Sequence, residues 1–104
     1  MAVYTIVRNS DGLIVNKIVL DDPSKYPSNP NFTLIQGDVG DIGYYYVNGQ
    51  VQVPQDIQQV MQQIQQAQSS GSTNVAQLVQ QLHQLRMRHY VQAVAVFVHE
   101  FLGA

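Results

Sequence analysis

The spacing of apolar residues changes at Pro54, and this change divides the chain into two regions that need different secondary structure. Before Pro54, short runs rich in Val, Ile and Tyr alternate with turn-forming residues, a pattern typical of β-strands. After Pro54, apolar residues recur every three or four positions among glutamines, a pattern typical of amphipathic helices. We therefore expect an α+β fold, with a small antiparallel β module over residues 1–53 and a helical hairpin over residues 54–104.

Two hairpins and one further strand are expected in the β module. The strands are predicted at Ala2–Val7, Leu13–Leu20, Phe32–Ile35, Tyr44–Val47 and Gln50–Val53. Asn9-Ser10-Asp11-Gly12 is a turn signal, with Gly12 able to take a positive φ. Asn48-Gly49 is the preferred sequence for a type I′ hairpin turn. Asp21–Asn31 holds three prolines, and Gly37–Gly43 repeats glycine and aspartate, so both are predicted to be loops.

Two helices are expected after Pro54, because proline suits the first helical position and Asp56 in the first turn suits the helix dipole. Ser69-Ser70-Gly71-Ser72 should end the first helix, and Asn74 followed by Gln77 resembles a capping box for the second. The second helix should run from about Val75 to about Leu102. At 1.5 Å per residue it is roughly 40 Å long, so part of it should project or pack on another chain.

The apolar stripe of the second helix changes direction along its length. The first stripe consists of Val75, Leu78, Val79, Leu82 and Leu85, and the second of Met87, Tyr90, Val91, Val94, Phe97, Val98 and Phe101. At about 100° per residue the two stripes differ by a quarter turn or more. The first should meet the helix at Ile57–Ile64, and the second should meet the β module, another subunit or both. A strand over Val91–Val98 is the alternative, because four of its eight residues are valine.

Composition narrows the partners and the chemistry. A net charge of −2 and only five Lys and Arg residues argue against nucleic acid as a partner. Cysteine is absent, which removes disulfides and thiolate metal sites. No apolar segment approaches the roughly 20 residues that cross a membrane, and residues 1–7 do not resemble a signal peptide. We expect a soluble protein that needs neither membrane nor cofactor.

Catalytic and metal-binding motifs are not apparent. His83, His89 and His99 are spaced by six and ten residues, whereas helical metal ligands share a face at three or four. A pH-sensitive or metal-bridged contact between subunits is the alternative role for them. Asp38 and Asp41 flank Gly40 without a distal acidic ligand for calcium. We predict no enzymatic activity and no metal site.

Protein–protein contacts are the function that these features favour. Candidates for an oligomer interface are the large residues of the second stripe, Met87, Tyr90, Val94, Phe97 and Phe101. Candidates for docking a partner are Tyr44, Tyr46, Arg86 and Arg88, because exposed tyrosine and arginine are common interface anchors. In three consecutive tyrosines, side chains alternate between faces, so at least one of Tyr44–Tyr46 should point away from the core.

The first half of the chain resembles a small β module found in virion proteins of tailed bacteriophages, including tail-fibre and fibre-assembly proteins. The parts that carry the resemblance are Leu13–Leu20, Asp22–Pro30, Gly37–Asp41, Ile42–Tyr46, Asn48-Gly49 and Pro54. This chain has Tyr44 where those proteins often have Trp, and amide-rich helices where theirs are charged. The resemblance implies a component of the tail, neck, baseplate or capsid surface, made in the bacterial cytoplasm, with no active site.

We therefore expect a virion structural protein that binds other virion subunits and assembles with itself as a trimer or a higher ring. Two alternatives keep the same sequence features. One is a tail or tail-fibre assembly chaperone that is absent from the mature particle, and the other is a phage-encoded inhibitor of a host protein. An enzyme subunit that depends on His83, His89 and His99 is a third alternative.

Overall fold

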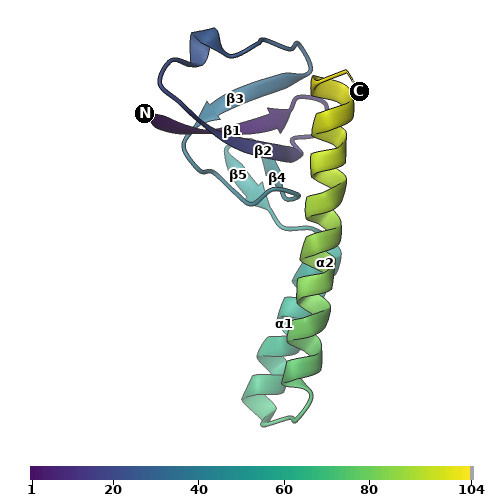
Figure 1. The fold of residues 1–104 in the computed structure, drawn as a ribbon. Helices are drawn as coiled ribbons and strands as arrows, with labels where there is room; N and C mark the ends of the chain where they lie inside the picture. Colours follow the sequence, from purple (N-terminus) through teal and green to yellow (C-terminus); the bar gives the residue numbers. More distant parts are fainter. Residues whose placement is uncertain (104) are drawn as a thin grey trace.

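Residues 1–103, which the computed structural model describes, form a β module at one end and a helical hairpin that projects from it. The molecule is elongated, with extents of 52 × 27 × 23 Å. Figure 1 shows the C-terminal half of the last helix beside the β module, while its other half runs along the projecting hairpin. The expected α+β fold, strands first and helices second, is confirmed.

The β module contains two small antiparallel sheets. Strands β1 (Ala2–Arg8), β2 (Ile14–Leu20) and β3 (Phe32–Gln36) form the first sheet in the order β2-β1-β3. Strands β4 (Tyr45–Val47) and β5 (Gln50–Gln52) form the second. Both predicted hairpin turns are confirmed, with φ of +83° at Gly12 and of +52° and +76° at Asn48 and Gly49. The loop after β2 contains a short 3₁₀ turn, η1 (Pro23–Lys25).

Three helical segments follow: α1 (Gln55–Ser70), α2 (Val75–Val96) and the π-helical turn η2 (Phe97–Phe101). The alternative of a strand over 91–98 is therefore wrong. Gly71, with φ of +69°, ends α1 as predicted. Pro54 is the residue before the helix rather than its first residue, and its carbonyl accepts from the backbone N–H of Gln58 at 3.0 Å.

The predicted capping box at the start of α2 is wrong. Asn74 precedes the helix, but its side chain makes no hydrogen bond to the backbone of the first turn. Its Oδ1 instead accepts from the Ser72 hydroxyl at 2.6 Å. The physical reason is local, because a serine hydroxyl two residues earlier competes for the same acceptor.

Apolar clusters cover both faces of the three-stranded sheet. On one face, buried residues of the strands pack against α2 and η2; this first cluster contains Ile6, Leu13, Val15, Phe32, Ala93 and Phe97. On the other face the second cluster contains Val7, Ile14, Tyr44 and Ile57. The β module and the helices thus share their core.

Two-sided burial also corrects the expectation for the three tyrosines. Their side chains alternate as predicted, but each direction leads to a cluster. Tyr45 packs against the first cluster, whereas Tyr44 is buried in the second and Tyr46 packs against it. None of the three points away from the core, because the sheet has a core on each face.

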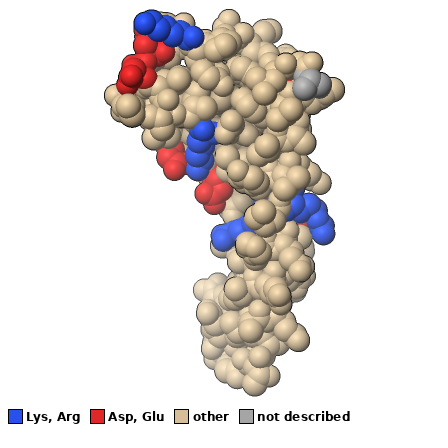
Figure 2. Space-filling model, viewed as in Figure 1, with Lys and Arg blue, Asp and Glu red and all other residues tan. Residues whose placement is uncertain are grey.

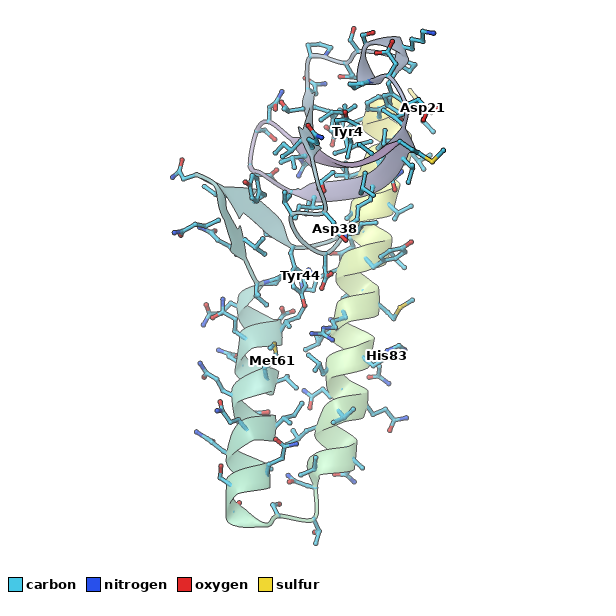
Figure 3. The ribbon with its side chains drawn as sticks, turned by 90° about the vertical axis from the view of Figure 1, so that its left-hand side faces the viewer. Tyr4, Asp21, Asp38, Tyr44, Met61 and His83 are labelled. Carbon is cyan, nitrogen blue, oxygen red and sulfur yellow. The ribbon has the colours of Figure 1, made fainter. Side chains whose placement is uncertain are left out.

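The hairpin of α1 and α2 forms along the first stripe as predicted, except that Val79 of that stripe is 49% exposed. Helix α1 runs beside the N-terminal half of α2 in Figure 3. It buries Ile57, Val60 and Ala67, and Leu82 and Leu85 of α2 pack against the cluster that contains Ile57. The C-terminal half of α2 then passes from α1 to the β module, where Ala93 is fully buried.

Candidate functional site: an exposed apolar face of helix α2

The C-terminal half of α2 carries apolar side chains that its own chain leaves uncovered. Met87 is 46% exposed, Tyr90 45%, Val91 57% and Val98 40%, and Leu102 just after η2 is 62% exposed. Val94 lies between them along the helix and is half-buried. Neighbouring apolar residues on one helix face form a contiguous patch, and such patches mark interaction surfaces more often than isolated exposed residues do.

This exposed face is centred on a different side of α2 from the face that its own chain uses, and the two adjoin at Tyr90 and Phe97. The inward face carries Ala93 and Phe97 toward the β module and Leu82 and Leu85 toward α1. At about 100° per residue, Val91 lies about 120° or more around the helix from all four of these residues. Val98 lies about 100° from Phe97 and about 140° or more from the other three. Helix α2 therefore has two apolar faces, and residues 1–103 cover one of them.

The structure separates the five residues predicted for an oligomer interface. Met87 and Tyr90 are exposed, and Val94 is half-buried. Phe97 is buried in the first cluster. Phe101 stacks on Phe97 with ring centroids 5.0 Å apart. Phe97 and Phe101 thus pack within the chain, because the β module docks on their side of the helix.

Tyr26 and Phe32 complete the aromatic contacts of η2. The ring of Phe101 lies 5.5 Å from that of Tyr26 and 5.4 Å from that of Phe32, between centroids. Burial raises the pKa of the Tyr26 hydroxyl above its usual value. These contacts fix η2 on the β module and leave the opposite face of the helix outward.

Ion pairs hold the same end of the helix. Arg8 donates to Glu100 at 2.6 Å and to Asp11 at 2.8 Å, and the carbonyl of Glu100 accepts from the Asn29 amide at 3.4 Å. The hydrogen bond to Asp11 raises the pKa of Arg8; burial opposes this, and Glu100 adds to it. The same bond lowers the pKa of Asp11, against the effect of burial. Arg8 therefore links β1 to the C-terminal turn.

A hollow of about 270 Å³ lies beside the exposed face, between α2 and the loop that precedes β4. It is lined by Lys17, Asp41, Ile42, Tyr44, Arg86, Met87 and Tyr90. Its base is fixed by Tyr44, which is buried and whose hydroxyl accepts from Nε of Arg86 at 3.1 Å. Met87 and Tyr90 belong both to the hollow and to the exposed face, so the two features are continuous.

The predicted docking residues therefore have different environments. Tyr44 lies at the base of the hollow, as its position in Figure 3 between the sheets and the helices illustrates. Tyr46 is half-buried against the second cluster. Arg86 and Arg88 are exposed on α2, and within residues 1–103 Arg88 forms no ion pair. Arg86 is thus held by its hydrogen bond to Tyr44, whereas Arg88 is available at the surface.

Where α1 begins, two contacts set the position of α2. Nε2 of His89 lies 3.0 Å from each carboxylate oxygen of Asp56, so this contact joins α2 to the first turn of α1. Although burial opposes it, hydrogen bonding from His89 and from the Ile57 amide lowers the pKa of Asp56. Gly43, with φ of +97°, lies so close that a Cβ there would be 2.8 Å from the His89 carbonyl carbon.

The projecting part of the hairpin, residues 57–85, contains no Asp, Glu, Lys or Arg. We refer to these residues as the arm. Figure 2 shows the lower end of the molecule free of acidic and basic residues, with the charges near the β module and its junction with the helices. Glutamines cover most of the arm, and His83 points away from α1 in Figure 3. The arm thus offers a neutral surface of amide donors and acceptors.

Over the part of the chain that the structure describes, three or more His, Asp or Glu side chains do not come together as metal ligands. In that same part, no helix combines the length and the apolar character needed to cross a membrane.

Sequence reasoning identified Met87 and Tyr90, but it did not select Val91 and Val98 from the second stripe. The sequence signal for Val91 and Val98 was their spacing, because Met87, Val91, Val94 and Val98 follow one another at intervals of four, three and four residues. Comparisons of the chain with models of protein families, with curated proteins and with solved structures found no match.

Proposed function

We propose that this chain is a non-enzymatic structural protein of a tailed-bacteriophage particle, where it binds copies of itself and other virion subunits. The observation that supports self-association is the exposed apolar face of α2. Met87, Val91 and Val98 on this face are 40% to 57% exposed and lie outside the chain's own core. Burying this face removes apolar surface from water, at about 25 cal/mol for each Å².

Charge distribution favours association between copies. Only 12% of the residues are charged, and residues 57–85 have none. Identical copies therefore meet little electrostatic repulsion along the hairpin. The charged residues gather instead on the β module and at its junction with α2, as Figure 2 shows.

A second kind of contact supports binding to other virion subunits. The hollow at Tyr44 combines apolar walls with the charged groups of Lys17, Asp41 and Arg86. Together with exposed Arg88, these groups suit a polar partner surface with an apolar side chain at its centre. The phage setting rests on the resemblance of parts of residues 13–54 to β modules of tail-associated proteins, and this resemblance implies a component of the tail, neck, baseplate or capsid surface.

Two measurements test this proposal. Light scattering of the purified chain should give a discrete mass of three or more subunits. Mass spectrometry of purified particles from the phage that encodes the chain should find it in a fixed ratio to the other virion proteins. A monomer would contradict self-association. Absence from finished particles would contradict the virion role, and presence in assembly intermediates alone would identify a chaperone.

Inhibition of a host protein would give a different pair of results. Tagged chain would recover a cellular protein in equal amounts, and neither particles nor assembly intermediates would contain the chain. That outcome would replace the structural role with inhibition of a host protein.

A further inference from the structure

We propose that three copies of the chain associate in parallel along a seven-residue repeat on α2, with the three α1 helices on the outside. This inference rests on the self-association proposed above and specifies its geometry. The contacting residues, which we refer to as the seam, are Gln80, Gln84, Met87, Val91, Val94 and Val98.

The first support for the seam is its spacing. Its members are separated alternately by four and three residues, which is the a and d pattern of a left-handed coiled coil. Five of the six side chains are exposed, and Val94 is half-buried. The repeat therefore runs along a side of α2 that its own chain leaves open.

The residues on the other side of α2 are consistent with α1 lying on the outside of the trimer. Leu78, Leu82 and Leu85 are half-buried on the α1 side, and Ala93 and Val96 face the β module. In the register of the seam these residues occupy the b, c and f positions, which lie on the outside of a coiled coil. Phe97 takes the g position beside the seam, and the seam ends at Val98 because the next d residue, Phe101, packs on the β module. The α1 helix and the β module can thus remain in place while the seams of three copies meet.

Charge identifies another copy of the chain as the occupant. In a parallel assembly of identical chains each seam residue meets its own copies around the axis, so a charged seam residue would face the same charge. The seam holds no charged residue over 19 positions, although Arg86 and Arg88 lie between its members. A different partner could balance a charge, whereas an identical copy in parallel cannot, so an uncharged seam favours identical copies in parallel.

Side-chain shape supports three strands. Val91 and Val98 occupy a positions and Val94 a d position, so the seam has β-branched residues at both. β-branched residues at a and d shift coiled coils from two strands toward three or four. The room at the centre of three helices also suits the long side chain of Met87.

Polarity along the seam supports the parallel arrangement. Gln80 and Gln84 lie toward the arm, and Val91, Val94 and Val98 lie toward the β module. In parallel chains each amide layer meets amides, which can hydrogen-bond to one another. A fully overlapping antiparallel arrangement would place the Gln80 amide against Val98, where burial without a partner is costly.

The mass of the assembly and the effect of one charge test the seam. The unmodified chain should scatter light as a trimer. Val91→Asp places a charge at the axis and should yield a folded monomer with unchanged helical circular dichroism. Val79→Asp is the matched control, because Val79 is 49% exposed on α2 but lies outside the seam; this variant should remain a trimer.

Orientation is tested by cross-linking, for which the chain is suited because it has no cysteine. Gln84→Cys should form disulfide-linked dimers within the trimer under mild oxidation, because parallel chains bring residue 84 next to its copies. Gln59→Cys, on the exposed surface of α1, should remain unlinked.

Each outcome separates this inference from the function on which it rests. A monomeric unmodified chain would overturn both the self-association and the seam. A trimer that survives Val91→Asp would overturn the seam alone. An assembly that Val91→Asp dissociates, but in which Gln84→Cys does not cross-link, would overturn the parallel arrangement. An assembly of two or four chains would overturn the number.

Discussion

The two ends of α2 pack in very different environments. The C-terminal end lies against a sheet with a two-sided core, and aromatic rings and the Arg8–Glu100 pair hold it there. The N-terminal end lies in the arm, where only Ile57, Val60 and Ala67 are buried and where charged residues are absent. Because local stability follows buried apolar contacts, we expect the arm to open more readily than the β module in a single chain.

This difference indicates what an assembly contributes. A trimer along the seam would add contacts to the arm through Gln80 and Gln84, where the single chain has few. The predictions below test the difference between the two ends, starting with the change that should cost the most stability.

Phe97→Ala should cause the largest loss. Phe97 is 8% exposed in the first cluster and stacks on Phe101, so truncation leaves a cavity in the shared core. We expect the free energy of unfolding to fall by about 3–5 kcal/mol, measured by urea denaturation. Val98→Ala is the control, because Val98 faces outward, and in the monomeric Val91→Asp background it should cost under about 1 kcal/mol. Equal losses for the two variants would contradict the inward position of Phe97.

Much of the fold follows from the sequence because its signals are local. Asn48-Gly49 specifies a hairpin turn whatever surrounds it, and the helical spacing from Ile57 onward persists through glutamines that favour helix. The strands, loops and helix boundaries were predicted from such patterns. Boundaries that depend on competing side chains, such as the cap at Asn74, were not.

The candidate site was only partly predictable, because burial along the second stripe depends on contacts between distant residues. Phe97 and Val98 are adjacent and both apolar, yet only the docked β module determines that the first is buried and the second exposed. Tyr44 shows the same effect, since its burial needs Ile57 and Val7. The pairing of Asp56 with His89 spans 33 residues, and no local pattern indicates it.

Ile57→Ala should cause the next largest loss, and it acts where the arm meets the β module. Ile57 is fully buried and belongs to the second cluster with Tyr44 and Ile14. We expect a loss of about 2–4 kcal/mol, with hydrogen exchange of α1 amides accelerated more than that of β1 amides. Met61→Ala, at a position 41% exposed on the same helix, should cost under about 1 kcal/mol. Equal acceleration in α1 and β1 would show that the two ends unfold as one unit.

Gly43→Ala should have an intermediate effect, because the added methyl group forces the loop before β4 away from α2. An added Cβ would lie 2.8 Å from the carbonyl carbon of His89, and φ at this position is +97°. We expect a loss of about 1–3 kcal/mol and a weaker Asp56–His89 contact, visible as a changed His89 ring signal in NMR spectra.

Gly49→Ala measures the backbone-strain part of that effect alone, so the difference between the two variants is the steric part. Gly49 also has a positive φ, +76°, but a Cβ there would meet nothing within 4 Å. Its loss should reflect backbone strain alone, about 1–2 kcal/mol, and the His89 signal should not change. If Gly49→Ala costs as much as Gly43→Ala, the close approach to α2 contributes nothing.

Asp56→Asn should have the smallest effect, and its sign depends on pH. His89 and the Ile57 amide lower the pKa of Asp56 in the folded chain, against the opposing effect of burial. A lowered folded-state pKa adds stability above the unfolded-state value, about 3.9, and this contribution is lost as pH falls through the folded-state value. The unmodified chain should therefore exceed Asp56→Asn in stability by under about 1 kcal/mol near neutral pH. The difference should shrink when the pH is lowered from neutral to below the unfolded-state pKa. Urea denaturation at both pH values measures it, with Asp41→Asn as the control, since Asp41 forms no ion pair within residues 1–103. A difference that grows in acid would mean that the ionised Asp56 carboxylate destabilises the junction. Packing at Ile57 and Gly43 alone would then join the arm to the β module.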